Sequence, residues 1–265
     1  MVPKPHGSAE TTIDYSNIKD AKHLLDIIGK DVYDEVHKED ADYRKYLQGH
    51  LKNAIFEKDP NDQQTPQDPC LLIHEYHTTV TSGYNNENPC KDRGEVRFSY
   101  TEGAECNKRK IKCKKDSDNE CGACAPFRRL HLCDHNLENI SDFDHINNDT
   151  LLADVCLAAK FEGETLTTQH GQHQLTYPDS HYEICTELAR SFADIGDIIR
   201  GKDLYRRDNK KDKLENNLKT IFKQIHEKLT DLRANDHYKD ENGGNFFKLR
   251  EDWWTANRAT VWEAI

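Results

Sequence analysis

The sequence predicts a mainly α-helical fold in which a loop-rich, disulfide-linked region precedes a helical bundle. Apolar residues recur at three- and four-residue spacing before residue 57 and after residue 148, which is the pattern of one buried helix face. Residues 70–147 sustain no such spacing and hold seven of the nine cysteines. Because 32% of the residues are charged and only 35% are hydrophobic, the core is lean, and we expect disulfide bonds to support it.

An N-terminal helical segment is predicted for residues 1–60. Residues 1–17 form a polar lead-in, and from Ile18 to Val36 the apolar residues fall on one helical face. A linker is expected from Lys58 to Pro69, where two prolines interrupt the pattern. Between these parts a second helix is expected from Asp42 to Phe56, with these residues facing inward: Tyr43, Tyr46, Leu47, Leu51 and Ile55.

The next predicted region, residues 61–147, consists mostly of loops. Gly, Asn and Asp recur through it. Long loops without secondary structure normally argue against an assignment, but cross-links between cysteines would hold such loops in place.

Helices are predicted again for residues 148–265. Asn148-Asp-Thr can cap a helix over residues 151–160, and Thr165 to Pro178 is expected to be a polar loop. A long helix should start at Pro178-Asp-Ser and end at Gly201.

Two further helices complete this region. The apolar residues from Leu214 to Leu232 give the clearest amphipathic pattern in the chain. After a break at residues 242–245, the last helix is expected from Phe246 to Ile265. It offers four large apolar side chains to a core: Phe247, Trp253, Trp254 and Trp262.

The net charge of −11 is unevenly distributed. Residues 134–197 contain thirteen Asp and Glu against two Lys and Arg, which gives −11 for that stretch alone. Residues 200–233 contain eleven Lys and Arg against six acids (+5), and residues 104–135 contain eight against five (+3). Because binding responds to local potential, basic segments in an acidic chain can still attract sulfated or phosphorylated polymers.

Disulfide bonds are the favoured interpretation of the cysteines, each stabilising the fold by roughly 2–4 kcal/mol. Because the number is odd, at least one is free, pairs between chains, or has its partner elsewhere. A zinc site is the alternative, since Cys121 and Cys124 have a ligand-like gap and Cys113, His131, Cys133 and His135 are near in sequence. No second pair has finger spacing. The cysteines are Cys70, Cys90, Cys106, Cys113, Cys121, Cys124, Cys133, Cys156 and Cys185.

Two basic segments are the candidate ligand-binding residues, for a polyanion. Cys106 and Cys113 flank the first, so less loop entropy would be lost on binding, and Arg and Lys both suit sulfate oxygens. A merely solvated loop is the plain alternative, and the disulfide framework argues against nucleic acid as a partner. The first segment supplies Lys108, Arg109, Lys110, Lys112, Lys114 and Lys115; the second supplies Arg206, Arg207, Lys210, Lys211 and Lys213.

No catalytic or cofactor site is predicted. Asp194 and Asp197 could share a helical turn, but a solvated face near a helix C-terminus is the better explanation. The histidines at 170, 173 and 181 have no fixed acidic partner, and no phosphate loop, nucleophile elbow or His-Glu-x-x-His helix is present. Arg128 and Arg129, in an apolar context, are expected to make structural ion pairs with Asp134 or the acidic stretch 142–154.

The block from Cys121 to Cys133, Cys-Gly-Ala-Cys-Ala-Pro-Phe-Arg-Arg-Leu-His-Leu-Cys, resembles the signature of the Duffy-binding-like adhesion domains of malaria parasites. Further blocks at residues 21–30, 189–205 and 251–258 extend the resemblance over nearly the whole chain. The particular likeness is to the N-terminal segment plus alpha-class domain that heads the erythrocyte membrane protein 1 family. It implies a Duffy-binding-like fold whose third, helical subdomain lies beyond Ile265.

The resemblance also implies roles for the cysteines. Seven of them match family blocks, whereas Cys113 and Cys121 look like additions and are expected to pair with each other. One of the seven should then have its partner beyond Ile265, because related domains commonly continue with a cysteine after a block like Val261 to Ile265.

The function that the resemblance implies is host-cell adhesion on the outer face of the infected red cell. The expected partners are host glycosaminoglycans such as heparan sulfate or heparin, or a red-cell receptor in rosetting, together with adjacent domains of the same long chain. The membrane anchor would lie far outside this fragment. The alternative is a structural head that supports a neighbouring receptor-binding domain and has no ligand of its own.

Overall fold

The computed structural model describes residues 24, 27–30, 43–57, 64–80, 88–93, 97–99, 103–106, 110–111, 124–205, 212–241 and 243–265. The chain divides into two compact units, residues 1–42 and 43–265. In the first unit, residues 24 and 27–30 are helical, as predicted, and the rest of the predicted helix from Ile18 to Val36 lies outside the described residues. All elements below belong to the second unit.

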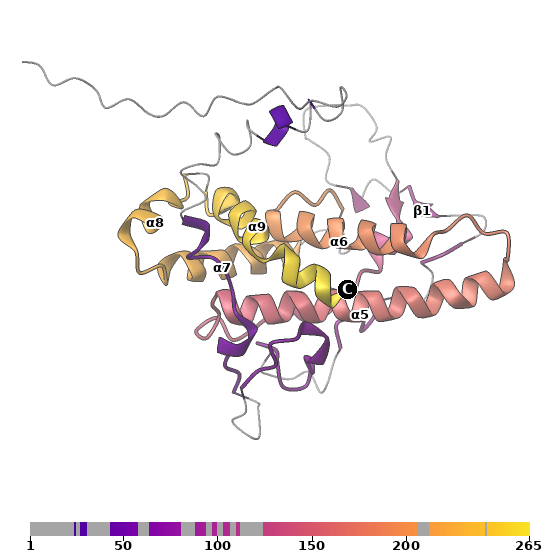
Figure 1. The fold of residues 1–265 in the computed structure, drawn as a ribbon, viewed down its shortest axis with the longest axis horizontal. Coiled ribbons are helices and arrows are strands. Elements are labelled where there is room, and N and C mark those ends of the chain that lie inside the picture. The colour runs from indigo at the N-terminus through magenta and orange to yellow at the C-terminus, as the bar shows by residue number, and fades with distance from the viewer. Residues whose placement is uncertain are drawn as a thin grey trace, which may run out of the picture. The chain divides into compact units, whose positions relative to one another are not determined.

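Three helices form the centre of the second unit: α5 (Asn148–Thr176), α6 (Ile184–Arg200) and α9 (Phe247–Ala264). Each packs against the other two, and Figure 1 shows α6 and α9 along one side of the long helix α5. Their shared core contains Leu151, Ile195 and Trp253, which are at most 1% exposed. Burial of such large side chains contributes about 1.5–3 kcal/mol each.

Three shorter helices extend this bundle: α4 (His135–Glu138), α7 (Lys213–Glu227) and α8 (Leu232–His237). α7 buries Leu218, Ile221 and Phe222 completely, and it packs against α4 and α9. The side chain of Asp231 caps α8 by accepting hydrogen bonds from the backbone N–H groups of Arg233 and Ala234.

Where the structure describes the cysteine-rich region, it has little regular structure, as predicted. It contains the 3₁₀ helix η3 (Pro69–Leu71), the short strands β1 (Ala104–Glu105) and β2 (Ala125–Pro126), and the helix α3 (Phe127–Leu130). β1 and β2 pair antiparallel, with Ala104 opposite Pro126. Disulfides join Cys90 to Cys133 and Cys106 to Cys124.

The prediction of a polar loop from Thr165 to Pro178 is wrong, because α5 continues as a helix to Thr176. Leu166 and His170 are buried on one face of this extension, whereas most other residues there are exposed. No proline interrupts the helix before Pro178, so intrahelical hydrogen bonds continue without a broad apolar face. Its true N-cap is Asn147, one residue before the predicted signal.

The predicted helix over residues 42–56 is also wrong. Residues 43–44 are helical, but a turn and the 3₁₀ helix η2 (Leu51–Asn53) follow them, and Ile55 is 80% exposed. Gly49 marks the break, because a Cβ there would lie 2.6 Å from the backbone oxygen of Asn148. Asn257 of α9 then fixes the segment, accepting from the Gly49 N–H and donating to the Leu47 carbonyl.

Three smaller differences concern the later helices. α6 begins at Ile184 rather than at Pro178, and the amphipathic helix ends at Glu227, so that Leu232 belongs to α8. Phe247 and Trp262 are 44% and 49% exposed, so neither is a core residue. The predicted end of α6 is confirmed by Gly201, which has φ +70°. None of the helices among the described residues has the length and apolar character needed to cross a membrane.

Candidate polyanion-binding surface

A backbone contact links the first predicted basic segment to the residue before the second. Ile111, within the first segment, forms an isolated antiparallel β-bridge with Tyr205, the residue before the second. Ile111 is 8% exposed, so the bridge lies in the protein interior. No local sequence pattern predicts this contact, because the paired residues are far apart in the chain and only one residue from each segment takes part.

Covalent and backbone links fix the first side of this bridge. The Cys106–Cys124 disulfide and the β1–β2 pair hold residues 104–106 against residues 124–126. The Phe127 N–H also donates to the Gly103 carbonyl at 3.1 Å. The backbone on which the first basic segment begins is therefore tied to the start of α3.

Arg129 of α3 fixes the second side of the bridge. Its Nε and Nη2 donate to the two carboxylate oxygens of Asp203 at 3.1 and 2.7 Å, a bidentate pair. Asp203 in turn accepts from the backbone N–H of Tyr205. Burial alone would lower the pKa of Arg129, but the negative charges of Asp203 and Asp134 outweigh it and raise the pKa.

Arg128 makes a second set of buried contacts from the same helix. It donates to Ser191 Oγ at 2.8 Å and pairs with Asp194 at 2.6 Å and Glu187 at 3.3 Å. Burial raises the pKa of Asp194 above its usual range, although the nearby Arg128 opposes that rise. These contacts join α3 to α6.

Glu162, fully buried on α5, continues this network. It accepts from Ser191 Oγ at 2.8 Å and from the Cys133 backbone N–H at 3.0 Å, and it pairs with Arg97 at 3.2 Å. Burial raises its pKa, with Arg97 the main opposing influence. α3, α5, α6 and the Cys90–Cys133 disulfide therefore meet around one buried ionic network.

The structural role predicted for Arg128 and Arg129 is confirmed. Asp134 is a partner of Arg129, at 3.9 Å, as expected. The other partners are Glu187, Asp194 and Asp203 rather than residues of the 142–154 stretch. Asp194 and Asp197 do not form an acid pair, since Asp194 contacts Arg128 and Asp197 contacts Arg200.

Much of the acidic stretch 134–197 points inward. Asp134, Asp154, Glu162 and Glu187 are all at most 4% exposed, and all but Asp154 are paired with arginines. Asp154 instead accepts three hydrogen bonds from Thr78 and Thr79. These acids are therefore structural partners inside the fold and are not part of a negative surface, although each buried pair also removes an arginine from the surface.

Of the eleven predicted ligand-binding cations, the structure describes Lys110 and Lys213. Lys110 directly precedes the bridge and is half-buried, and Lys213, exposed at the start of α7, donates to Asn139 Oδ1 at 2.7 Å. The other nine lie outside the described residues: Lys108, Arg109, Lys112, Lys114, Lys115, Arg206, Arg207, Lys210 and Lys211.

Four of the predicted disulfide cysteines are paired, which removes Cys124 and Cys133 as thiolate ligands for zinc. Cys70, Cys156 and Cys185 are free thiols, so their predicted pairing is absent from the part of the chain that is described. The thiols of Cys70 and Cys156 both contact backbone carbonyls of α9, at Glu263 and Thr260. Cys113 and Cys121 lie outside the described residues.

Comparison with known proteins agrees with this geometry. Residues 20–55 match the family described as N-terminal segments of PfEMP1, and residues 122–265 match the Duffy binding domain. The NTS-DBL1-alpha and CIDR-gamma double domain of PfEMP1 from the Plasmodium falciparum varO strain is similar in structure. The TM-score is 0.72 at 38% identity, covering 91% of this chain and 35% of that one.

Two further relatives are similar over shorter or more divergent stretches. The PfEMP1 IT4var13 DBLbeta domain bound to ICAM-1 has a TM-score of 0.71 at 31% identity, covering 89% of this chain and 55% of that one. The Duffy receptor beta form of Plasmodium knowlesi is 26% identical over 170 residues, 60% of this chain. The match spans 12% of that receptor's length.

Proposed function

The chain belongs to the Duffy-binding-domain family, in the NTS-DBL-alpha arrangement of PfEMP1, and from this we propose that it binds sulfated glycosaminoglycans on host cells. Heparan sulfate or heparin is the ligand class, and binding to red-cell receptors in rosetting is part of the same proposal. The family and its structural neighbours are receptor-binding and adhesion domains rather than enzymes.

The observation that carries this proposal is the β-bridge between Ile111 and Tyr205. It joins the backbones from which six cations of the first segment and five of the second extend. A linear sulfated polymer carries many negative charges along its length, so a ligand that meets one segment is brought near the other. The combined segments supply more charge-assisted contacts than either alone.

The contacts that hold the two sides of the bridge, here called the clamp, support binding by limiting the conformational entropy lost. The Cys106–Cys124 disulfide and the Arg129–Asp203 ion pair hold both segment bases before any ligand arrives. A preorganised site loses less conformational freedom on association. Individual contacts remain weak and salt-sensitive, and many copies on one cell surface would supply avidity.

The relatives bear on the class of partner. The structure of one DBLbeta domain was solved with ICAM-1 bound, and the Plasmodium relatives are named Duffy receptors. We propose that this chain acts likewise on the outer face of the infected red cell, joined to adjacent domains of a longer protein that hold its membrane anchor. We also propose the division into an N-terminal segment (1–60), a disulfide-rich subdomain (61–147) and a helical subdomain (148–265).

Salt-stepped elution from heparin, with binding to red cells measured in parallel, tests the proposal. Replacing the six cations of the first segment by Gln should lower the eluting salt concentration and the affinity. At about 0.2–1 kcal/mol per exposed charge, six charges correspond to about tenfold in affinity or more.

A control replaces Lys219, Lys223, Lys239 and Lys248, which lie on or next to α7, α8 and α9, by Gln, and its elution should shift far less per charge removed than that of the segment variant. Equal elution of the segment variant, the control and the unmodified protein would sink the proposal.

A structural head is the second candidate function. It is favoured by the varO double domain, in which the similar part is followed by a CIDR-gamma domain. This candidate predicts that the isolated chain binds neither heparin nor red cells at low salt, whereas a chain extended by its neighbouring domain binds red cells.

A further inference from the structure

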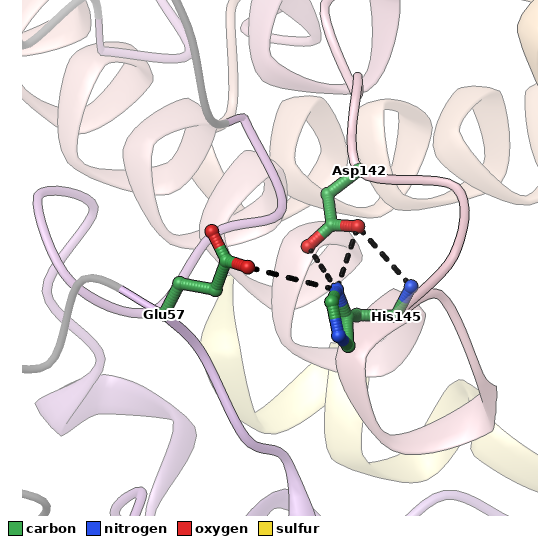
Figure 2. Close-up of side chains that lie close together, drawn as sticks. All are labelled: Glu57, Asp142 and His145. Atoms are coloured by element: carbon green, nitrogen blue, oxygen red, sulfur yellow. Dashed lines mark hydrogen bonds and ion pairs between the residues drawn. The ribbon is translucent and has the colours of Figure 1, made fainter.

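Three side chains of metal-ligating type converge where the residue Glu57, after η2, meets the loop that precedes α5. Figure 2 shows Glu57, Asp142 and His145 with their side chains directed toward one another. His145 Nδ1 lies 2.8 and 2.9 Å from the Asp142 oxygens and 4.0 Å from Glu57 Oε1. All three ligand atoms lie within 4.8 Å of one another.

We propose that Glu57, Asp142 and His145 form a binding site for a divalent transition-metal ion, with Zn²⁺ the best match. One imidazole nitrogen and two carboxylate oxygens provide three ligands, and solvent can supply the fourth. Zn²⁺ accepts this mixed nitrogen and oxygen set, whereas Ca²⁺ and Mg²⁺ prefer oxygen ligands alone.

The distances require only small movements. Zn–N and Zn–O bonds of about 2.0–2.1 Å in a tetrahedron place neighbouring ligand atoms roughly 3.3 Å apart. The His145–Asp142 separation of 2.8 Å is slightly shorter and the His145–Glu57 separation of 4.0 Å slightly longer. The side chains of His145 and Glu57 are 61% and 64% exposed, so both can adjust.

Asp142 is the fixed member of the cluster. Its side chain is only 14% exposed, its backbone N–H donates to the Thr79 carbonyl, and its Oδ1 accepts from the His145 backbone N–H. The loop is also held from α7, because Lys228 Nζ donates to the Ile146 carbonyl at 2.8 Å. Such support around a ligand limits the entropy lost when the metal binds.

The charges around the cluster depend on pH. The hydrogen bond and charge of Asp142 raise the pKa of His145, with smaller contributions from Glu57 and Asp144. Below that pKa the imidazolium neutralises one carboxylate; above it, a neutral imidazole beside two carboxylates leaves net negative charge. Lys228 is the cation that faces this loop from α7. The two carboxylates therefore give the cluster a charge that suits a cation.

A bound ion would join two distant parts of the chain. Glu57 follows η2, whereas Asp142 and His145 precede the capping residue Asn147 of α5. The site would therefore link the segment after η2 to the N-terminal end of the longest helix. Metal that binds only the folded state stabilises it by RT ln(1 + [M]/Kd), so the melting temperature should rise with the free metal concentration.

Calorimetric titration with ZnCl₂ tests the site, using the untagged 265-residue protein after its accessible thiols have been alkylated. Alkylation prevents Cys70 and Cys185, which are both exposed, from binding the metal. One Zn²⁺ per chain is expected, with a higher melting temperature. Loss of a ligand in His145→Gln or Glu57→Gln should weaken binding at least about tenfold, and His181→Gln, an exposed histidine at the other end of α5, should bind as the unmodified protein does.

Cobalt provides a second readout. The Co²⁺ complex should show d–d absorption without thiolate charge-transfer bands, because the ligands are nitrogen and oxygen. The proposal is overturned if the alkylated protein binds no Zn²⁺ at millimolar concentration, or if either ligand variant binds as tightly as His181→Gln. Circular dichroism that matches between variants confirms that any loss reflects the site rather than the fold.

Discussion

Removal of the Arg129 guanidinium tests whether α3 holds the base of the basic segments. Arg129→Met keeps an unbranched apolar side chain but removes both hydrogen bonds to Asp203, at 3.1 and 2.7 Å. Breaking a buried ion pair on one side costs about 3–5 kcal/mol. Asp203 is 11% exposed and Asp134 keeps its 2.8 Å contact with Arg93, so we expect a value near the lower end, about 3 kcal/mol.

Urea unfolding, followed by tryptophan fluorescence at pH 7 without reductant, measures this loss. Arg129→Lys retains the charge but not the planar guanidinium that makes two hydrogen bonds. It should therefore lower the free energy of unfolding by a measurable amount, but by less than Arg129→Met. The double variant Arg129→Met/Asp203→Leu should regain part of the stability, because it removes the unpaired buried carboxylate.

The matched control is Arg190→Met. Arg190 pairs with Glu187 at 2.6 Å but is 60% exposed, so its loss should cost less than about 1 kcal/mol. If Arg129→Met unfolds within 1 kcal/mol of the unmodified protein, or no more easily than Arg190→Met, the clamp does not hold this region together and the reasoning fails.

Three further predictions concern packing, pH and modification. Gly196→Ala should lower the free energy of unfolding by about 1–3 kcal/mol, because its Cβ would lie 2.8 Å from the Trp254 ring. Gly171→Ala has open space around it on α5, and it should raise the free energy of unfolding by roughly 0.5–1 kcal/mol. Urea midpoints in the opposite order would contradict this. Burial raises the pKa of Asp154 in the folded protein to about 6. The folded state therefore favours the protonated carboxyl, and this contribution to stability is full below the pKa of the unfolded chain and is lost as the pH rises through 6. Lowering the pH from 7 to 5 should then stabilise the unmodified protein relative to Asp154→Asn by about 1 kcal/mol, and a difference that does not change with pH would refute it. Asn139-Ile-Ser and Asn148-Asp-Thr are formal N-glycosylation signals. Both should stay unglycosylated in folded protein secreted from mammalian cells, because the Nδ2 groups of Asn139 and Asn148 donate to the His135 and Tyr46 carbonyls at 2.8 and 2.9 Å. A correctly folded product with a glycan at either site, seen by mass spectrometry, would contradict this.

Sequence pattern succeeds in this chain where a helix has one buried apolar face and a distinct end. Leu218, Ile221 and Phe222 follow helical spacing and are fully buried, and Gly201 ends α6 in the left-handed conformation. The C-terminal half of α5 was missed because it extends largely into solvent, where a helix needs no apolar stripe. The predicted helix at residues 42–56 fails because Gly49 packs against the backbone of Asn148, a tertiary contact that no local pattern encodes.

For the candidate surface too, local features can be predicted from the sequence, whereas long-range contacts cannot. The basic segments are visible as runs of Lys and Arg, and the apolar context of Arg128 and Arg129 indicates burial. The Ile111–Tyr205 bridge and the Asp203 partner of Arg129 depend on chain segments that meet only after folding. Conversely, acids that look like a negative surface in the sequence, such as Glu162 and Glu187, prove to be internal partners of arginines.

The most direct test of the central claim, that two basic segments joined at one bridge form one polyanion site, is the binding stoichiometry of a short heparin oligosaccharide. Calorimetry at low salt should give one oligosaccharide per chain. Neutralising either segment should lower the affinity while the stoichiometry stays at one. Two oligosaccharides per chain, falling to one with unchanged affinity when either segment is neutralised, would show two independent sites and contradict the account.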